Sequence, residues 1–371
     1  MKTFVLMAGG SGGHLFPAMA LAQELLRRGH TIDLMTDHRV KSYGSNFPAR
    51  QIHVVPAATP SLSNPIKFVR GGLTILRGIG SAIGKLRRIK PDAVIAFGGY
   101  PTFPPFMAAN LLGIPGVLHE QNAVLGRANR ALGRFADVLA MSYDSTKFAD
   151  RLNLEKQITG NPVRDKVRAL AGVPYPALDA DGPIRIFVVA GSQGARAFSD
   201  IVPEAIALIP EALRHRLQIA QQCRAEDLDR VAERYRQLKV NVELATFFED
   251  LPERITRTHL VICRSGASTI ADVCVLGRPM IMVPLPGSID GDQKNNAMVV
   301  DAAGGGWIAE QATLSPQSLG TRLTTLLADP AALQQAAEAA RALGQPRAVE
   351  KLADLAERMA GIGRTELEHS K

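Results

Sequence analysis

Short apolar runs alternate with amphipathic helical patterns along the 371-residue chain. This alternation predicts parallel β-sheets covered by helices, the α/β class. In the first half, the runs predict strands at 4–7, 31–35, 52–55, 93–97, 116–119 and 138–141. In the second half, they predict strands at 184–190, 217–220, 240–245, 260–263, 280–283 and 307–309.

A stretch rich in proline, glycine and aspartate at 172–183 divides the pattern, which restarts after it. We therefore predict two doubly wound, Rossmann-like domains. The first covers 1–164 and the second 165–341, and the final helix, about 342–362, packs back on the first. The tail after Gly361 is expected to fray.

Glycine-rich turns follow four of the predicted strands. The first is Gly9-Gly10-Ser11-Gly12-Gly13-His14, before a helix in which Pro17 suits the first turn. The other three are Gly98-Gly99-Tyr100-Pro101, Gly191-Ser192-Gln193-Gly194-Ala195-Arg196 and Arg264-Ser265-Gly266-Ala267. Free N–H groups at a helix start suit a phosphate or diphosphate, and a histidine at its mouth could act as a base.

Two other interpretations of these turns remain open, and a third is excluded. Each could be an ordinary tight turn, with Ser265 or Thr269 capping a helix. A nicotinamide-dependent oxidoreductase uses similar turns, but its G-x-G-x-x-G motif needs glycine where Leu15 stands. A P-loop is excluded because no Gly-Lys-Ser/Thr follows the first turn.

The net charge of +8 is unevenly distributed along the chain. Residues 1–164 hold 20 Lys/Arg and 9 Asp/Glu, whereas the remainder holds 23 and 26. A basic first half indicates an anionic partner. The three cysteines form no C-x-x-C motif, so neither a disulfide framework nor a zinc site is expected. A reducing compartment is therefore the default expectation. The chain contains no run of about 20 apolar residues, so the sequence predicts no membrane span.

Residues 61–90 carry seven basic residues and no acidic one, with apolar residues at helical spacing. Such a segment can lie on an anionic membrane surface, although an ordinary domain helix is the alternative. Few aromatics for base stacking argue against nucleic acid. Five glycines predict a broken pair of helices. The expected membrane-facing residues are Ile66, Lys67, Val69, Arg70, Leu73, Leu76, Ile79 and Ile83.

Six motifs in order give the chain a family resemblance. They are the four glycine turns together with His119-Glu120-Gln121-Asn122 and Asn161-Pro162-Val163-Arg164. Over roughly residues 3–360, the chain resembles the bacterial N-acetylglucosaminyltransferases that form lipid II. The resemblance implies a GT-B fold, with two Rossmann-like domains facing across a cleft. It also implies inverting, β-1,4 transfer of N-acetylglucosamine from UDP-N-acetylglucosamine to lipid I.

The resemblance assigns roles to individual residues. His14 would be the general base on the acceptor hydroxyl, with Glu120 as a second candidate, and the loop from Ser11 to His14 would meet the acceptor diphosphate. The acceptor side would comprise Gly98, Gly99, Tyr100 and Asn122. The donor set would comprise Ser11, Gly12, Gly13, Asn122, Arg164, Ser192, Gln193, Gly194, Phe248, Ser265, Gly266, Ala267, Asp272 and Gln293.

Three residues depart from the family pattern. Asp272 stands where glutamate usually meets the ribose, Asp292 replaces a usual glutamine, and Ala190 replaces a glycine. No cofactor and no catalytic metal are expected, because helix N-termini and basic groups would stabilise the departing UDP. Asp179 and Asp181 spell a D-x-D only within the linker.

The resemblance also implies a location and partners. The enzyme would be peripheral, on the cytoplasmic face of the inner membrane, with cell-wall synthesis and division proteins as further partners and no nucleic acid. Two alternatives remain: another GT-B transferase acting on a lipid acceptor, and an inactive membrane-surface scaffold.

Overall fold

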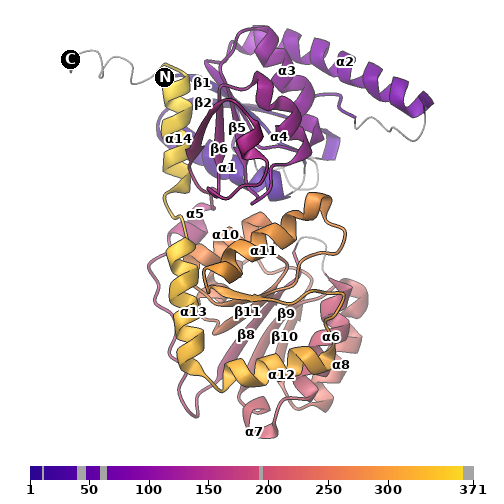
Figure 1. Cartoon of the computed structure of the whole chain (residues 1–371), viewed down its shortest axis with the longest axis vertical. Helices are drawn as coiled ribbons and strands as arrows, with labels where there is room; N and C mark the ends of the chain where they lie inside the picture. Colours follow the sequence, from indigo (N-terminus) through magenta and orange to yellow (C-terminus); the bar gives the residue numbers. More distant parts are fainter. Residues whose placement is uncertain (11, 40–46, 59–64, 192–194, 362–371) are drawn as a thin grey trace, which may run out of the picture. The chain divides into compact units, whose positions relative to one another are not determined.

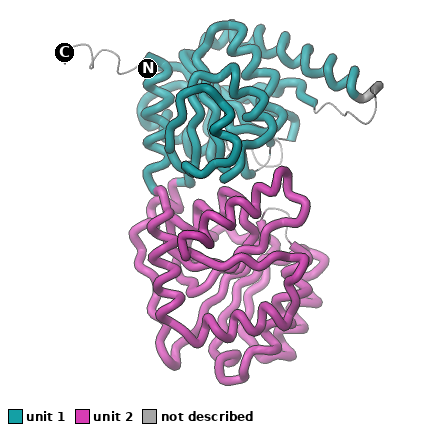
Figure 2. Tube along the Cα trace, in the orientation of Figure 1, with its two compact units in different colours: residues 1–164, 346–371 teal, residues 165–345 magenta. Residues whose placement is uncertain are grey.

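The computed structural model describes residues 1–10, 12–39, 47–58, 65–191 and 195–361. The chain divides into two compact units (Figure 2). Unit 1 comprises residues 1–164 and 346–371, and unit 2 comprises residues 165–345. Both units are α/β, so the predicted pair of doubly wound domains is confirmed.

Unit 1 is built on a seven-stranded sheet in the order β3-β2-β1-β4-β5-β6-β7, with every pair parallel. The strands are β1 (Thr3–Met7), β2 (Thr31–Thr36), β3 (Gln51–Val54), β4 (Ala93–Ala96), β5 (Gly116–Glu120), β6 (Val138–Met141) and β7 (Glu155–Ile158). The sequence pattern missed β7, because this edge strand is polar and largely exposed.

Helices cover both faces of this sheet (Figure 1). Alternate residues of β1 point to opposite faces: Phe4 and Leu6 join one core cluster, and Val5 and Met7 join another. The helices are α1 (Gly12–Arg27), α2 (Pro65–Ile89), η2 (Tyr100–Thr102), α3 (Phe103–Leu111), α4 (Arg127–Leu132), η3 (Gly133–Phe135), η4 (Ala149–Arg151) and α14 (Ala348–Met359).

Helix α14 returns to unit 1 at the end of the chain and packs beside α1. Leu352, Leu355 and Ala356 are buried in the same core cluster as β1. Its Glu357 accepts hydrogen bonds from Arg28 at 2.6 Å and from His30 at 2.7 Å. The last helix is therefore an integral layer of unit 1.

Unit 2 repeats the plan with a six-stranded parallel sheet in the order β10-β9-β8-β11-β12-β13. Its strands are β8 (Ile184–Val189), β9 (Leu217–Gln222), β10 (Asn241–Ala245), β11 (Leu260–Cys263), β12 (Met280–Met282) and β13 (Gly306–Ile308). Its helices are α5 (Asp165–Arg168), α6 (Arg196–Ala207), α7 (Glu211–Arg214), η5 (Ala225–Asp227), α8 (Leu228–Gln237), α9 (Leu251–Thr256), α10 (Ala267–Leu276), η6 (Ile289–Gly291), α11 (Asp292–Ala302), α12 (Pro316–Leu327) and α13 (Pro330–Leu343).

The strand order of each sheet reverses at one point, between β1 and β4 in unit 1 and between β8 and β11 in unit 2. Met7 pairs with both Met35 of β2 and Ala96 of β4, so these strands end together. Open α/β sheets bind ligands outside the carboxyl ends at such reversals. The described glycines that follow β1, β4, β8 and β11 lie at these two positions.

Two helix predictions were wrong. Helix α1 begins at Gly12, so Pro17 lies inside the helix instead of in its first turn. Residues 65–89 form one continuous helix of 25 residues instead of a broken pair (Figure 1). The glycine penalty is offset by packing, because Ala82 and Leu86 of α2 are buried in the unit 1 core. In the part of the chain that the structure describes, no helix is both long and apolar enough to cross a bilayer.

Two glycines of α2 provide a matched test of this packing. A Cβ added at Gly78 would clash with the carbonyl oxygen of Pro56 and lie 2.9 Å from Cβ of Pro104, whereas one at Gly80 would meet nothing within 4 Å. We expect Gly78→Ala to lower the free energy of unfolding by about 1–3 kcal/mol. Gly80→Ala should raise it by about 0.5–1 kcal/mol, because alanine is the better helix former.

Urea unfolding of both variants measures these changes. An equal gain in stability for the two alanine variants would contradict the close packing of Gly78.

Candidate active site

His14 lies in the first turn of α1, at the carboxyl edge of the unit 1 sheet. Its ring packs against the second glycine turn, since a Cβ added at Gly99 would lie 3.3 Å from its Cδ2. Gly98 and Gly99 both have positive φ angles, 86° and 81°, which residues other than glycine rarely adopt. These glycines therefore shape the space that the imidazole occupies.

The His14 ring is also hydrogen-bonded on one side. Its Nδ1 lies 3.2 Å from Oε1 of Gln121, in the loop after β5. Gln121 Nε2 lies 2.9 Å from Nδ1 of His119 and 3.1 Å from the carbonyl oxygen of His119. His119 Nε2 donates to the carbonyl oxygen of Gly160 at 2.9 Å. A continuous chain of hydrogen bonds thus runs from the half-buried His14 into the core.

Glu120, the second candidate base, is buried and saturated with donors. Its Oε1 accepts from the backbone N–H of Asn122 at 3.0 Å and from Asn122 Nδ2 at 3.1 Å. Its Oε2 accepts from the backbone N–H of Gly126 at 2.8 Å and from Asn129 Nδ2 at 2.9 Å. The carboxylate holds the loop from 121 to 126 in place, so the geometry favours His14 as the base.

Tyr100 closes the site on the β2 side. Its hydroxyl donates to Oδ2 of Asp37 at 3.0 Å, and Arg39 Nε donates to the same oxygen at 2.6 Å. The Arg39 guanidinium lies 5.0 Å from the centre of the Tyr100 ring. Burial and the bond to Asp37 raise the pKa of Tyr100, so its proton is firmly held.

Sequence reasoning missed two residues of this site. Gln121 is only one position of the motif His119-Glu120-Gln121-Asn122, and Asn129 lies outside every motif. Asn129 Nδ2 also donates to the carbonyl oxygen of His119 at 3.2 Å, while its buried Oδ1 has no hydrogen-bond partner among the described residues. A Cβ added at Gly98 would lie 3.6 Å from both Asn129 and His14. A signal for Asn129 was its position nine residues after Glu120, in the helix α4 that follows the end of β5.

Unit 2 places Ser265 at the reversal of its sheet, directly after β11. Ser265 is fully buried, and its Oγ has no hydrogen-bond partner in the described part of the chain. Asn296 Nδ2 donates to the Ser265 carbonyl oxygen at 3.1 Å. Helix α10 then starts at Ala267 with Gly266 as its N-cap, so neither Ser265 nor Thr269 is the cap residue. The start of α10 thus offers backbone N–H groups beside a buried hydroxyl.

Arg264 next to it has a structural role. Its Nη1 donates to the carbonyl oxygens of Val283 and Pro284 at 3.0 and 3.3 Å, and its Nη2 donates to Gln311 Oε1 at 2.6 Å. Burial lowers the pKa of Arg264. These bonds fix the loops after β11, β12 and β13 relative to one another.

The remaining predicted donor residues have mixed surroundings. Gln293 is half-buried on α11, and its Oε1 accepts from the backbone N–H of Leu285 at 3.0 Å. Asp272 is buried on α10 and already has a partner. The Phe248 ring is buried against Phe187, with centroids 5.4 Å apart, while the exposed ring of that loop belongs to Phe247.

The other predicted residues are placed as follows. Gly12 and Gly13 form the first turn of α1, and a Cβ added at Gly13 would meet open space. The guanidinium of Arg164, in unit 1, lies 5.1 Å from the centre of the Phe16 ring. Ser11, Ser192, Gln193 and Gly194 lie outside the described residues, as do the side chains of Ile66 and Lys67.

The predicted membrane-facing stripe of α2 divides into two parts. Val69, Leu73 and Leu76 are 59%, 49% and 65% exposed, and Phe68 beside them is 48% exposed. Ile79 and Ile83 are instead partly buried and pack against the unit 1 core, so they lie outside the exposed part of this stripe. The α2 apolar patch is defined here as Phe68, Val69, Leu73 and Leu76.

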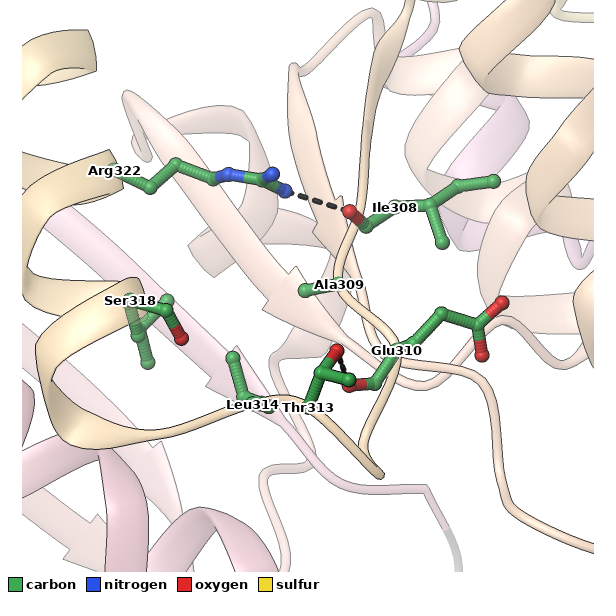
Figure 3. Close-up of a pocket in the computed structure, with 8 residues that line it drawn as sticks. Ile308, Ala309, Glu310, Thr313, Leu314, Ser318 and Arg322 are labelled. Atoms are coloured by element: carbon green, nitrogen blue, oxygen red, sulfur yellow. Dashed lines mark hydrogen bonds between the residues drawn. The ribbon is translucent and has the colours of Figure 1, made fainter.

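A cavity of about 220 Å³ in unit 2 lies apart from the predicted residues (Figure 3). It lies between the carboxyl end of β13 and the start of α12. Its charged groups are paired: Arg322 donates to the Ile308 carbonyl oxygen at 2.6 Å, and Glu310 binds Lys294 at 2.8 Å. The lining residues are Ile308, Ala309, Glu310, Thr313, Leu314, Ser318, Leu319 and Arg322. Nothing in this lining suggests a phosphate or sugar site.

Comparisons with known proteins cover almost the whole chain. Residues 4–141 match the glycosyltransferase family 28 N-terminal domain, and residues 185–359 match the family 28 C-terminal domain. A relative from Methylobacterium radiotolerans is 47% identical over 95% of this chain and 96% of its own. One from Bradyrhizobium diazoefficiens is 46% identical over 96% and 98%. Each is named UDP-N-acetylglucosamine--N-acetylmuramyl-(pentapeptide) pyrophosphoryl-undecaprenol N-acetylglucosamine transferase.

Solved structures agree with this result. The crystal structure of MurG from Acinetobacter baumannii is similar with a TM-score of 0.78 and 31% identity, covering 96% of this chain and all of that one. A kitacinnamycin glycosyltransferase, at 19% identity and a TM-score of 0.70 over 97% and 99% of the two chains, shares the fold.

The buried His119 gives a test of the site by pH. Burial lowers the pKa of His119 to about 4, so the folded chain keeps it neutral where an unfolded histidine, with a pKa of about 6.5, takes up a proton. The unfolded state binds more protons between these values, so the free energy of unfolding falls as the pH drops. His119→Phe keeps a ring beside Phe97. Between pH 7 and pH 4, the free energy of unfolding of this variant should decrease by up to about 3 kcal/mol less than that of wild type.

Urea unfolding at several pH values measures the two curves. Parallel curves for wild type and His119→Phe would contradict a neutral, buried His119.

Proposed function

The chain belongs to glycosyltransferase family 28, and from this premise we propose that it transfers N-acetylglucosamine from UDP-N-acetylglucosamine to lipid I. The products are lipid II and UDP. The observation that carries this function is near-full-length identity of 46–47% with relatives named for this reaction. Unit 1 supplies the acceptor side and unit 2 the donor side.

On the acceptor side, His14 acts as the general base. The 4-hydroxyl of the muramoyl sugar gives its proton to the imidazole while its oxygen attacks C1 of N-acetylglucosamine. The bond from C1 to the UDP oxygen breaks, and its electron pair leaves with UDP. Attack opposite the leaving group inverts the anomeric centre and makes a β-1,4 link. Gly98, Gly99, Tyr100 and Asn122 line this side of the site.

On the donor side, the start of α10 faces the departing diphosphate. Its backbone N–H groups and the Ser265 hydroxyl are donors that suit negative charge. Gln293 and Asp272 read the sugar and the ribose. This arrangement needs no divalent metal.

The α2 apolar patch supports a peripheral position on the cytoplasmic face of the inner membrane. Exposed apolar side chains at positions 69, 73 and 76 share one side of the helix, and Arg70 and Arg77 lie exposed beside them. Apolar side chains favour the lipid interior, and arginines favour anionic headgroups. The undecaprenyl chain of the acceptor would then enter unit 1 from the membrane.

Transfer of labelled sugar from UDP-N-acetylglucosamine to a lipid I analogue tests the proposed reaction. Wild type should transfer, also in the presence of EDTA, and His14→Ala should lose about 10²-fold or more in kcat because the base is gone. His215→Ala, which removes an exposed histidine of unit 2, is the control and should match wild type.

Three outcomes of this assay would contradict parts of the proposal. No transfer by wild type would exclude this acceptor. Full activity of His14→Ala would exclude His14 as the base. Loss of transfer in EDTA would exclude the metal-free mechanism.

Binding to phosphatidylglycerol-containing vesicles tests the α2 apolar patch. The triple variant Val69→Ser, Leu73→Ser, Leu76→Ser should bind at least about tenfold more weakly, since burial of each such side chain contributes about 1.5–3 kcal/mol. Leu208→Ser, at an exposed leucine of unit 2, is the matched control and should bind like wild type. Vesicle binding of the triple variant equal to wild type would place the membrane contact elsewhere.

A further inference from the structure

The hydrogen-bond chain behind His14 has a direction that the atoms themselves fix. The Gly160 carbonyl oxygen can only accept, so His119 Nε2 must carry the proton and donate to it at 2.9 Å. The opposite nitrogen of a neutral imidazole is then an acceptor. His119 Nδ1 therefore receives a hydrogen bond from Gln121 Nε2 at 2.9 Å.

The same constraint orients the Gln121 amide. Its nitrogen has two protons, and two acceptors face it: Nδ1 of His119 and the carbonyl oxygen of His119, at 3.1 Å. A flipped amide would place its oxygen against both acceptors. The amide oxygen must therefore face His14, where it accepts a hydrogen bond from Nδ1–H at 3.2 Å.

We propose that Gln121 and His119 are positioning residues that hold His14 in the tautomer with Nδ1 protonated and Nε2 free to take the acceptor's proton. This inference rests on the proposed function. It gives a role in the reaction to two buried polar residues, each of which is at most 2% exposed. An amide oxygen also accepts from Nδ1–H before and after the proton transfer, so the bond persists when the imidazolium forms.

The environment of His119 keeps its imidazole neutral, so the hydrogen bonds that link His119, Gln121 and His14 keep one direction. A protonated His119 would have no lone pair for Gln121, and the amide could then turn its nitrogen toward His14. Complete burial and the ring of Phe97, 5.3 Å away between centroids, oppose protonation. Neighbouring Glu120 is occupied by Asn122, Gly126 and Asn129, so it does not compete for these protons.

The test combines a spectroscopic and a kinetic measurement on the full-length protein. With 15N-labelled histidine, the His14 ring, assigned by comparison with His14→Ala, should show a protonated Nδ1 and an unprotonated Nε2 in wild type. Gln121→Met keeps the side-chain length, but its thioether is only a weak hydrogen-bond acceptor and has no N–H groups for His119 to orient. It should show both tautomers, with kcat lowered by about tenfold or more and the KM for UDP-N-acetylglucosamine unchanged.

Gln221→Met is the matched control. Gln221 is also a buried glutamine, which accepts from the Tyr235 hydroxyl at 2.7 Å, but it lies in the core of unit 2. It should leave the His14 tautomer and kcat at wild-type values, even where both variants lose stability. His119→Phe removes one of the two acceptors for the amide and should show the same tautomer mixing as Gln121→Met, in smaller proportion.

Two results would overturn the proposal. One is a wild-type His14 with its proton on Nε2, whatever the activity. The other is a Gln121→Met variant with the wild-type tautomer and kcat. Failure of wild type to transfer sugar would instead refute the proposed function, because the tautomer is measured without substrate.

Discussion

Parallel pairing of every strand is the constraint on which both units depend. It brings the carboxyl ends of all strands in a sheet to one edge, and the reversal of strand order opens that edge at one position. In unit 1, His14 after β1 and Gly98-Gly99 after β4 therefore meet. In unit 2, the same geometry places Ser265 and the start of α10 after β11, next to β8. One architectural rule thus places the proposed base in one unit and the proposed anion site in the other.

The division of labour between Glu120 and His14 follows from what surrounds each group. Four N–H donors hold the Glu120 carboxylate, and releasing it to accept a substrate proton would leave them unpaired in a buried site. The same saturation makes Glu120 a poor nucleophile for a double displacement. His14 is half-buried and bonded through Nδ1. A single displacement with His14 as base therefore fits the geometry better than any mechanism through the carboxylate.

The sequence pattern predicted the features that neighbouring residues determine. Apolar runs located the central strands, and glycine turns located the sheet edges where candidate residues lie. The sequence could not reveal contacts between distant residues: the hydrogen bond between His14 and Gln121 spans 107 positions. Helix α2 is continuous because Gly78 fits against Pro56 and Pro104, which glycine propensity alone does not encode. Burial of Phe248 against Phe187 and the inward packing of Ile79 likewise depend on tertiary structure. The polar edge strand β7 had no apolar pattern to predict it.

The central claim is that a hydroxyl of lipid I, deprotonated by His14, attacks the donor sugar in one step. The stereochemistry of the new glycosidic bond tests this claim most directly. Proton NMR of the disaccharide formed from UDP-N-acetylglucosamine and a lipid I analogue reports the anomeric configuration through its coupling constant. A single displacement at the α-linked donor predicts a β-1,4 link. An α link would require retention of configuration and would contradict the mechanism proposed for this site.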